Sequence, residues 1–150
     1  MTTVYDVPPE ILIKEIAAKL KSSDKFRLPE KLKFVKTGTH AEKAPVQQDW
    51  WYTRVASVLR KIYINQYIGV SRLAAYFGGA RDRRTKPDSA RKGSRAILRH
   101  ALKQLEEAGY VLYVKGMGRT VSPAGRSFLD NTTHEIIQKL VKEIPELAKY

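Results

Sequence analysis

The segment from residue 49 to residue 63 constrains the fold more than any other. It contains two neighbouring rows of apolar side chains at helical spacing, and only a narrow stripe of its circumference is polar. The two rows are Trp51, Val55, Val58 and Ile62, and Tyr52, Ala56, Leu59 and Tyr63. A helix that is apolar over most of its circumference needs neighbours on several sides. The sequence therefore predicts a fold built around this central amphipathic helix, with Asp49 placed to cap it.

Two further helices are predicted in the first half of the chain. One covers residues 8–21, because proline is tolerated only in the first turn and apolar residues then recur on one face. Residues 22–45 lose this periodicity and are rich in lysine, which predicts a long connection with at most one short helix. A short helix is predicted over 70–77, and we expect Gly78-Gly79 to end it with a left-handed turn.

The second half of the chain predicts one hairpin between two helices. Ser94 can cap the first helix and Gly109 can end it. Residues 110–122 alternate as strands do on either side of a glycine-containing turn, which is typical of a β-hairpin. Ser122 can cap the last helix, and Pro123 is suited to its first turn. We expect this helix to bend or break around 130–131.

This order of elements is that of a winged helix, a relative of the helix-turn-helix in which the hairpin is the wing. The chain has 150 residues, enough for one continuous core, and its apolar residues are spread from end to end. The sequence therefore predicts a mainly α fold with one small β-hairpin, arranged as a single winged-helix-like domain over residues 1–150.

The charge of the chain is strongly positive. Its 28 Lys and Arg against 15 Asp and Glu give a net charge of +13, which attracts nucleic acid or an anionic membrane surface. No apolar stretch is long enough to span a bilayer, and the first residues lack the pattern of a signal peptide, so we expect a protein of the cell interior with no membrane partner. The absence of cysteine excludes disulfides, thiolate catalysis and cysteine-ligated zinc.

Almost half of the net charge lies in residues 81–100. We interpret residues 80–93 as a mobile basic loop, because this stretch is too polar and too rich in turn-forming residues for a core element. On the helix that follows, positive residues repeat every four positions and form a ridge. Guanidinium groups bind phosphate oxygens in bidentate fashion, so the run predicts a nucleic-acid surface. Its candidate binding residues are Arg81, Arg83, Arg84, Lys86, Arg91, Lys92, Arg95, Arg99 and Lys103.

A second candidate set, Arg54, Arg60 and Lys61, lies on the polar stripe of the central helix. A mostly buried helix must still emerge at some face, and that face is naturally charged, so the pattern supports a binding role and a solvated surface equally. The aromatic residues of this helix could stack on bases, but aromatics at helical spacing more often belong to a core. We expect core positions for Trp51 and Tyr63.

The sequence offers little chemistry for catalysis. His40, His100 and His134 lie far apart, without the spacing of a metal site or a neighbouring acid pair. The segment 116–120 lacks the spacing and the lysine of a phosphate-binding loop and stands where a hairpin turn is expected. We therefore expect no enzyme, no catalytic residue, no metal, no cofactor and no small-molecule substrate.

Three blocks of sequence, taken in order, resemble one known family. They are Trp51-Tyr52-Thr53-Arg54 through Arg60 to Tyr63, Gly69-Val70 through Tyr76 to Gly78-Gly79, and Pro87 followed by Ser94, Ile97, Arg99, Ala101-Leu102 and Leu105-Glu106. With them the chain resembles, over nearly its whole length, the small-subunit ribosomal protein numbered nineteen of archaea and eukaryotes, which is unrelated to the bacterial protein of that number. One departure is Lys103, where the family usually has glutamine, whereas this chain has Gln104 one residue later.

The resemblance implies a structural protein in the head of the small ribosomal subunit in the cytoplasm, bound to ribosomal RNA beside neighbouring proteins and assembly factors. It also implies a part in subunit assembly and in the maturation of the subunit's RNA, and it adds weight to Arg54, Arg60 and Arg99, which fall in family motifs. The alternative is a transcription regulator that places the helix after Ser94 in a DNA major groove. Positive residues are also frequent in the first helix and in the connection after it. Positive charge on several sides of the protein favours folded RNA, which presents phosphates in several directions, over DNA bound at one face.

Overall fold

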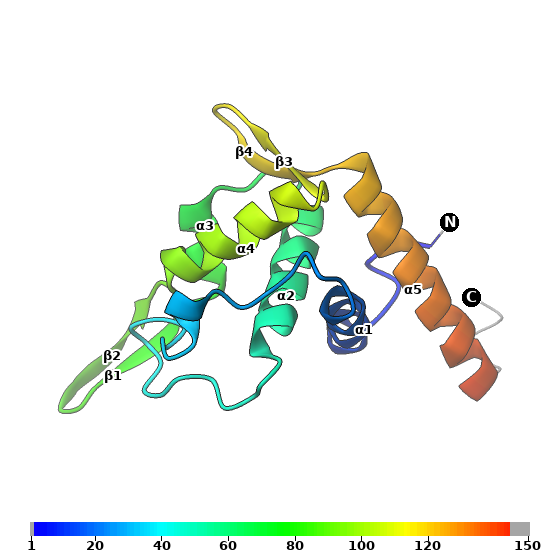
Figure 1. The fold of residues 1–150 in the computed structure, drawn as a ribbon. Coiled ribbons are helices and arrows are strands. Elements are labelled where there is room, and N and C mark those ends of the chain that lie inside the picture. The colour runs from blue at the N-terminus through cyan, green and yellow to red at the C-terminus, as the bar shows by residue number, and fades with distance from the viewer. Residues whose placement is uncertain (1, 145–150) are drawn as a thin grey trace.

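Helix α2, Trp50–Asn65, lies at the centre of the computed structural model, which describes residues 2–144. Its apolar side chains are buried on several sides, and α1 (Pro9–Lys21) and α4 (Arg95–Glu107) pack against it (Figure 1). The prediction of a central helix is therefore confirmed. Asp49 stands at the N-cap position, but its carboxylate makes no capping hydrogen bond and accepts one from Lys21 Nζ at 2.9 Å instead.

The remaining helices and the expected hairpin also form near their predicted positions. Their bounds are Glu30–Leu32 for the 3-10 turn η1, Val70–Tyr76 for α3, Val111–Val114 for β3, Gly118–Val121 for β4 and Pro123–Glu143 for α5. Strands β3 and β4 pair antiparallel, with Val111 opposite Val121. The mainly α fold with a small hairpin is confirmed.

The last helix, α5, begins as predicted but continues where a bend was expected. The Gly125 N–H donates to Ser122 Oγ at 3.0 Å, which confirms the serine cap. The helix is unbroken through residues 130–131, so the expected bend is wrong. Asp130 accepts a hydrogen bond from the Tyr63 hydroxyl at 3.0 Å and so does not compete for the helix backbone. No helix of residues 2–144 is both long enough and apolar enough to cross a membrane.

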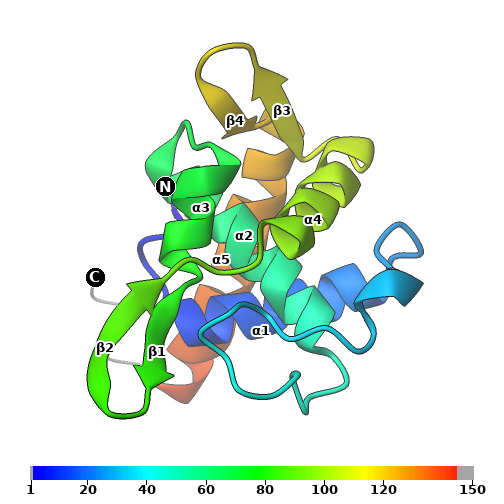
Figure 2. The ribbon, with the colours of Figure 1, turned by 90° about the vertical axis from the view of Figure 1, so that its left-hand side faces the viewer.

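The interpretation of residues 80–93 as a mobile loop is wrong, because they form a second antiparallel hairpin. Strand β1, Gly79–Arg83, pairs with β2, Lys86–Arg91, with a register irregularity between Arg81 and Arg83. The hairpin projects away from the helices (Figure 2). Nearly all of its side chains are exposed, so it lacks the alternation of apolar and polar residues by which a half-buried strand is recognised.

Two glycines close the base of this second hairpin. Gly78 does not adopt the expected left-handed conformation, which in residues 2–144 is found among glycines only at positions 109, 116 and 118. A Cβ atom on Gly78 would instead collide with the Arg91 carbonyl oxygen, and one on Gly93 would collide with that of Phe77. Glycine is required here for close backbone approach rather than for a special dihedral angle.

The arrangement is compatible with a winged helix that carries an insertion. Ile68, between α2 and α3, exchanges two backbone hydrogen bonds with Arg119 of β4, at 3.0 and 2.9 Å. Helices α3 and α4 then precede the β3–β4 hairpin, which occupies the place of the wing. The β1–β2 hairpin lies between α3 and α4, where a helix-turn-helix has only a short turn.

Candidate nucleic-acid interface

The β1–β2 hairpin presents its positive side chains to solvent. Arg81, Arg83, Arg84 and Arg91 line one hollow of about 410 Å³ together with Asp82, and within residues 2–144 none of these arginines has a carboxylate partner. The Asp82 carboxylate accepts instead from the Arg84 backbone N–H at 2.7 Å, which supports the left-handed backbone of Arg84 in the turn. Unpaired guanidinium groups keep their full set of donors for phosphate oxygens.

Helix α4 starts directly from the base of this hairpin and continues the positive surface. Arg95 and Arg99 are exposed and, in the described part of the chain, have no ion pair. Lys103 is also exposed, but its Nζ lies 3.9 Å from Glu107 Oε1. Lys92, just after β2, donates to Ser71 Oγ at 3.2 Å. The least engaged cations of the ridge therefore lie in the first turns of α4. This end of α4 adjoins the β1–β2 hairpin (Figure 1).

The three candidates on α2 occupy different environments. Arg54 and Lys61 are seven positions apart and so share a helix face, and each lies over an aromatic ring at the end of α3. The Arg54 guanidinium is 4.7 Å from the Phe77 ring centre, and Lys61 Nζ is 4.6 Å from that of Tyr76. Arg60 points about 100° away from Lys61, and its buried Nε has no hydrogen-bond partner within residues 2–144.

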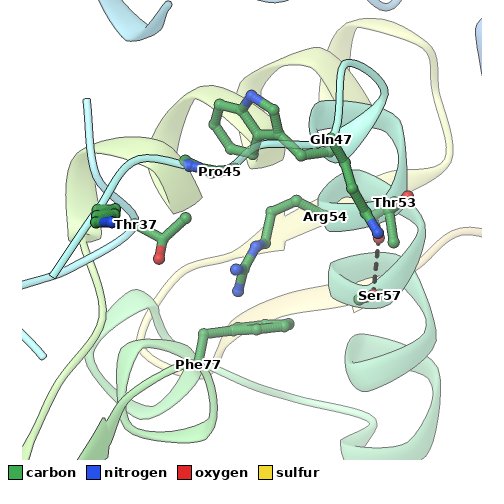
Figure 3. A pocket seen from close by; sticks show the side chains of 9 residues that line it. Thr37, Pro45, Gln47, Thr53, Arg54, Ser57 and Phe77 are labelled. Atoms are coloured by element: carbon green, nitrogen blue, oxygen red, sulfur yellow. Dashed lines mark hydrogen bonds between the residues drawn. The ribbon is translucent and has the colours of Figure 1, made fainter. Parts of the chain in front are cut away.

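A pocket of about 440 Å³ surrounds the Arg54 side chain. Figure 3 shows the guanidinium extending into it above the Phe77 ring. Burial lowers the pKa of Arg54, which means that the charged group has lost part of its hydration. The surrounding side chains come from α2, the end of α3 and the connection before α2, among them Thr37, Pro45, Gln47, Thr53, Ser57 and Phe77.

The contribution of Phe77 and of the 37–47 connection to this pocket was not predicted. Nothing in the periodicity of residues 22–45 shows that they cross beside α2. The Ser94 N–H donates to the Thr37 carbonyl oxygen at 2.9 Å, and this long-range hydrogen bond holds the connection against the entry of α4. Only the aromatic pair at 76–77, which ends a short helix, could have been noted from the sequence.

The large aromatic residues of α2 serve mainly the core. Trp51 is fully buried, as expected, and its Nε1 donates to Gln104 Oε1 at 3.0 Å. Gln104 Nε2 in turn donates to the Arg27 carbonyl oxygen at 2.7 Å, so this glutamine joins the core helix to the connection. Tyr63 is half-buried and packs against the core. Burial and the hydrogen bond to Asp130 raise the pKa of Tyr63.

Several cations elsewhere on the molecule are paired with carboxylates that join elements of the fold. Arg119 Nε donates to Glu106 Oε1 at 2.8 Å, with less than a third of either side chain exposed. Between α1 and α5, Lys19 pairs with Glu135 at 2.6 Å, and Lys139 pairs with Glu15 at 3.0 Å. The hydrogen bond from Lys19 holds the pKa of Glu135 below its usual value. These pairs join elements of the fold, whereas the cations of β1–β2 do not.

Fold and charge together define a class: a strongly basic, mainly α-helical protein with one projecting hairpin of unpaired arginines. The family described as Ribosomal protein S19e matches residues 3–139 of this chain. The small ribosomal subunit protein eS19 of Aeropyrum pernix is 45% identical over 152 residues, which cover 100% of this chain and 99% of the relative. The same protein of Thermoplasma acidophilum is 45% identical over 150 residues, with the same coverage.

A eukaryotic relative is more distant but also matches over most of its length. The small ribosomal subunit protein eS19A of Schizosaccharomyces pombe is 36% identical over 137 residues, which cover 91% of this chain and 95% of the relative. The chain therefore belongs to the ribosomal protein S19e family, which confirms the resemblance found in the sequence. Membership of a family of ribosomal proteins also agrees with the expectation that the chain is not an enzyme.

Proposed function

We propose that this chain is a structural component of the small ribosomal subunit and binds ribosomal RNA. The observation that carries the RNA contact is the row of exposed, unpaired guanidinium groups on β1–β2 and the start of α4. The main contact set comprises Arg81, Arg83, Arg84, Lys86, Arg91, Lys92, Arg95, Arg99 and Lys103. A second set on α2 comprises Arg54, Arg60 and Lys61.

The form of the hairpin supports RNA rather than DNA as the partner. A helix-turn-helix regulator inserts the first residues of its recognition helix into a DNA major groove. In this chain the β1–β2 hairpin projects from the N-terminal end of α4, and the hairpin carries the unpaired arginines (Figure 2). Folded RNA presents phosphates in several directions and is recognised largely by shape and backbone. A projecting arginine-rich ribbon beside a charged helix suits such a target.

The names of the relatives support the wider setting of this proposal. We place the protein in cytoplasmic ribosomes, in the head of the small subunit, next to other small-subunit proteins. We also propose contacts with assembly factors and a part in assembly and in maturation of the subunit's RNA. One continuous core over residues 2–144 supports a single winged-helix-like domain, with residues 1 and 145–150 of the proposed range lying outside the described residues.

Sedimentation of a tagged chain in cells that lack their own copy tests the proposal. We expect the intact chain to migrate with small subunits or their precursors, and to leave those fractions after RNase treatment. The double variant Arg84→Glu/Arg99→Glu should remain at the top of the gradient although it folds. Lys142→Glu, an equally exposed reversal near the end of α5, serves as the control and should sediment like the parent. Normal sedimentation of the double variant would contradict the assigned surface.

A further inference from the structure

The pocket around Arg54 lies at the root of the β1–β2 hairpin. Phe77, which forms one wall, stands just before β1, and Thr37, on another side, accepts the hydrogen bond of Ser94 just after β2. The pocket and the hairpin therefore share the same short backbone connections. The pocket therefore adjoins the base of the surface that we assign to the RNA contact.

The donors of the Arg54 guanidinium are not engaged by residues 2–144. Its guanidinium lies on the Phe77 ring and is partly desolvated, as the lowered pKa indicates, yet it makes no hydrogen bond to any described side chain or carbonyl. These donors are therefore available to an anionic ligand that enters the pocket. Lys43 lines the same pocket, so two cations are available to one ligand.

The rest of the lining is suited to a flat ring rather than to an anion alone. Trp50 and Pro45 contribute apolar surface in addition to that of Phe77. Gln47 and Thr53 provide hydrogen-bonding groups. The volume, about 440 Å³, lies in the range of pockets that hold small organic ligands and exceeds what a lone phosphate needs. An aromatic ring joined to an anionic group matches both parts of the lining, and a nucleotide has this composition.

We propose that the Arg54 pocket holds one unpaired nucleotide of the bound RNA. Its phosphate meets the guanidinium of Arg54 and the ammonium of Lys43, and its base lies against the apolar lining near Phe77. This inference rests on the proposed function, since the nucleotide belongs to the RNA that the hairpin contacts. A base within a duplex is stacked and paired, so a bulged or single-stranded nucleotide is the form that can enter.

Nucleotide binding by the full chain tests the pocket directly. We expect adenosine 5′-monophosphate to shift the NMR signals of the Arg54 side chain and the Phe77 ring at concentrations at least tenfold lower than ribose 5-phosphate, which lacks the base. Phe77→Leu should weaken adenosine 5′-monophosphate binding three- to tenfold and should weaken ribose 5-phosphate binding by a smaller factor, because only the nucleotide has a base to lose contact with the ring. Equal effects of the two ligands, or tighter binding of a glutamate-rich peptide than of the nucleotide, would overturn the proposal.

A pair of RNA hairpins separates failure of this inference from failure of the proposed function. Arg54→Gln should weaken binding to an RNA hairpin with one bulged nucleotide about tenfold and leave a fully paired hairpin almost unaffected. Arg72→Gln, an exposed α3 arginine outside the pocket, is the matched control and should change neither affinity. Equal loss, or no loss, for both RNAs would refute the pocket while the hairpin contact stands. Failure of the parent chain to bind either RNA would refute the proposed function itself.

Discussion

The two hairpins of the molecule both carry arginine, and they use it in opposite ways. Arg119 of β4 is held by Glu106 at 2.8 Å, lies over the Tyr113 ring at 5.2 Å and exchanges backbone hydrogen bonds with Ile68. The arginines of β1–β2 are exposed and, within residues 2–144, are bound to no carboxylate. The first arrangement attaches a hairpin to the core, and the second leaves charge available to a partner.

The comparison teaches that residue type does not determine what an arginine contributes. The β3–β4 hairpin follows α4 directly, so the Glu106 carboxylate near the end of that helix reaches Arg119. The β1–β2 hairpin projects from the other end of α4, where its own two carboxylates are outnumbered. We therefore expect substitutions in β3–β4 to affect folding stability and substitutions in β1–β2 to affect RNA affinity.

The largest effect is expected from reversing two charges on the projecting hairpin. Each charge-assisted hydrogen bond contributes about 1.5–3 kcal/mol, and 1.4 kcal/mol corresponds to a tenfold change in affinity. Arg81→Glu/Arg83→Glu should therefore lower affinity for small-subunit ribosomal RNA about 100-fold, measured by filter binding at fixed salt. Its urea unfolding curve should match that of the parent. A loss smaller than about threefold would remove the distinction between the hairpins.

The next largest effect is expected from removing the arginine that is paired. Arg119→Ala leaves the partly buried Glu106 carboxylate without its partner and should reduce the free energy of unfolding by about 1–3 kcal/mol. Arg83→Ala, on the other hairpin, should change it by less than about 0.5 kcal/mol. Urea titration followed by circular dichroism measures both. Equal destabilisation by the two variants would show that β1–β2 is as firmly tied to the core as β3–β4.

A smaller difference is expected in the salt dependence of RNA binding. Each phosphate contact contributes roughly 0.7–0.9 to the slope of log affinity against log salt. Arg91→Gln should reduce the slope by about that amount, whereas Arg119→Gln should leave it unchanged if the variant is still folded. Affinities at four or more salt concentrations give both slopes. A reduced slope for the Arg119 variant alone would reverse the roles assigned to the hairpins.

The smallest effect is expected on α4, within the ridge itself. Lys103 lies near Glu107, at 3.9 Å, so part of its charge is already compensated, while Arg99 has no such neighbour among the described residues. Lys103→Gln should therefore weaken RNA binding by less than about threefold, and Arg99→Gln by about tenfold. Competition binding of the two variants against the parent resolves the difference. The reverse order would place the contact farther along α4.

Much of the fold could be predicted from the sequence, because most elements have a buried face that leaves a periodic pattern. The rows of α2 and the serine and proline that open α5 are such signals. The β1–β2 hairpin buries neither face and has no such pattern. Its strands follow from backbone pairing and from the glycines at 78 and 93, whose close approach to carbonyl groups depends on the folded structure.

The candidate site could be predicted only in part for a related reason. Composition identified where the cations are, but not which of them carboxylates neutralise, because an ion pair such as Lys19 with Glu135 joins distant parts of the chain. The sequence also did not distinguish the environments of Arg54, Arg60 and Lys61, which it grouped on one polar stripe. In the structure two of them lie over the aromatic residues that end α3, and Arg60 faces elsewhere.

Photo-crosslinking from both hairpins in assembled small subunits tests the central claim most directly. Lys86, the first residue of β2 after the β1–β2 turn, and Met117, in the turn of β3–β4, are both exposed, and each can be replaced singly by benzoylphenylalanine. Position 86 should crosslink to ribosomal RNA, and position 117 should give protein crosslinks or none. Crosslinks to RNA from position 117 with none from position 86 would contradict the account.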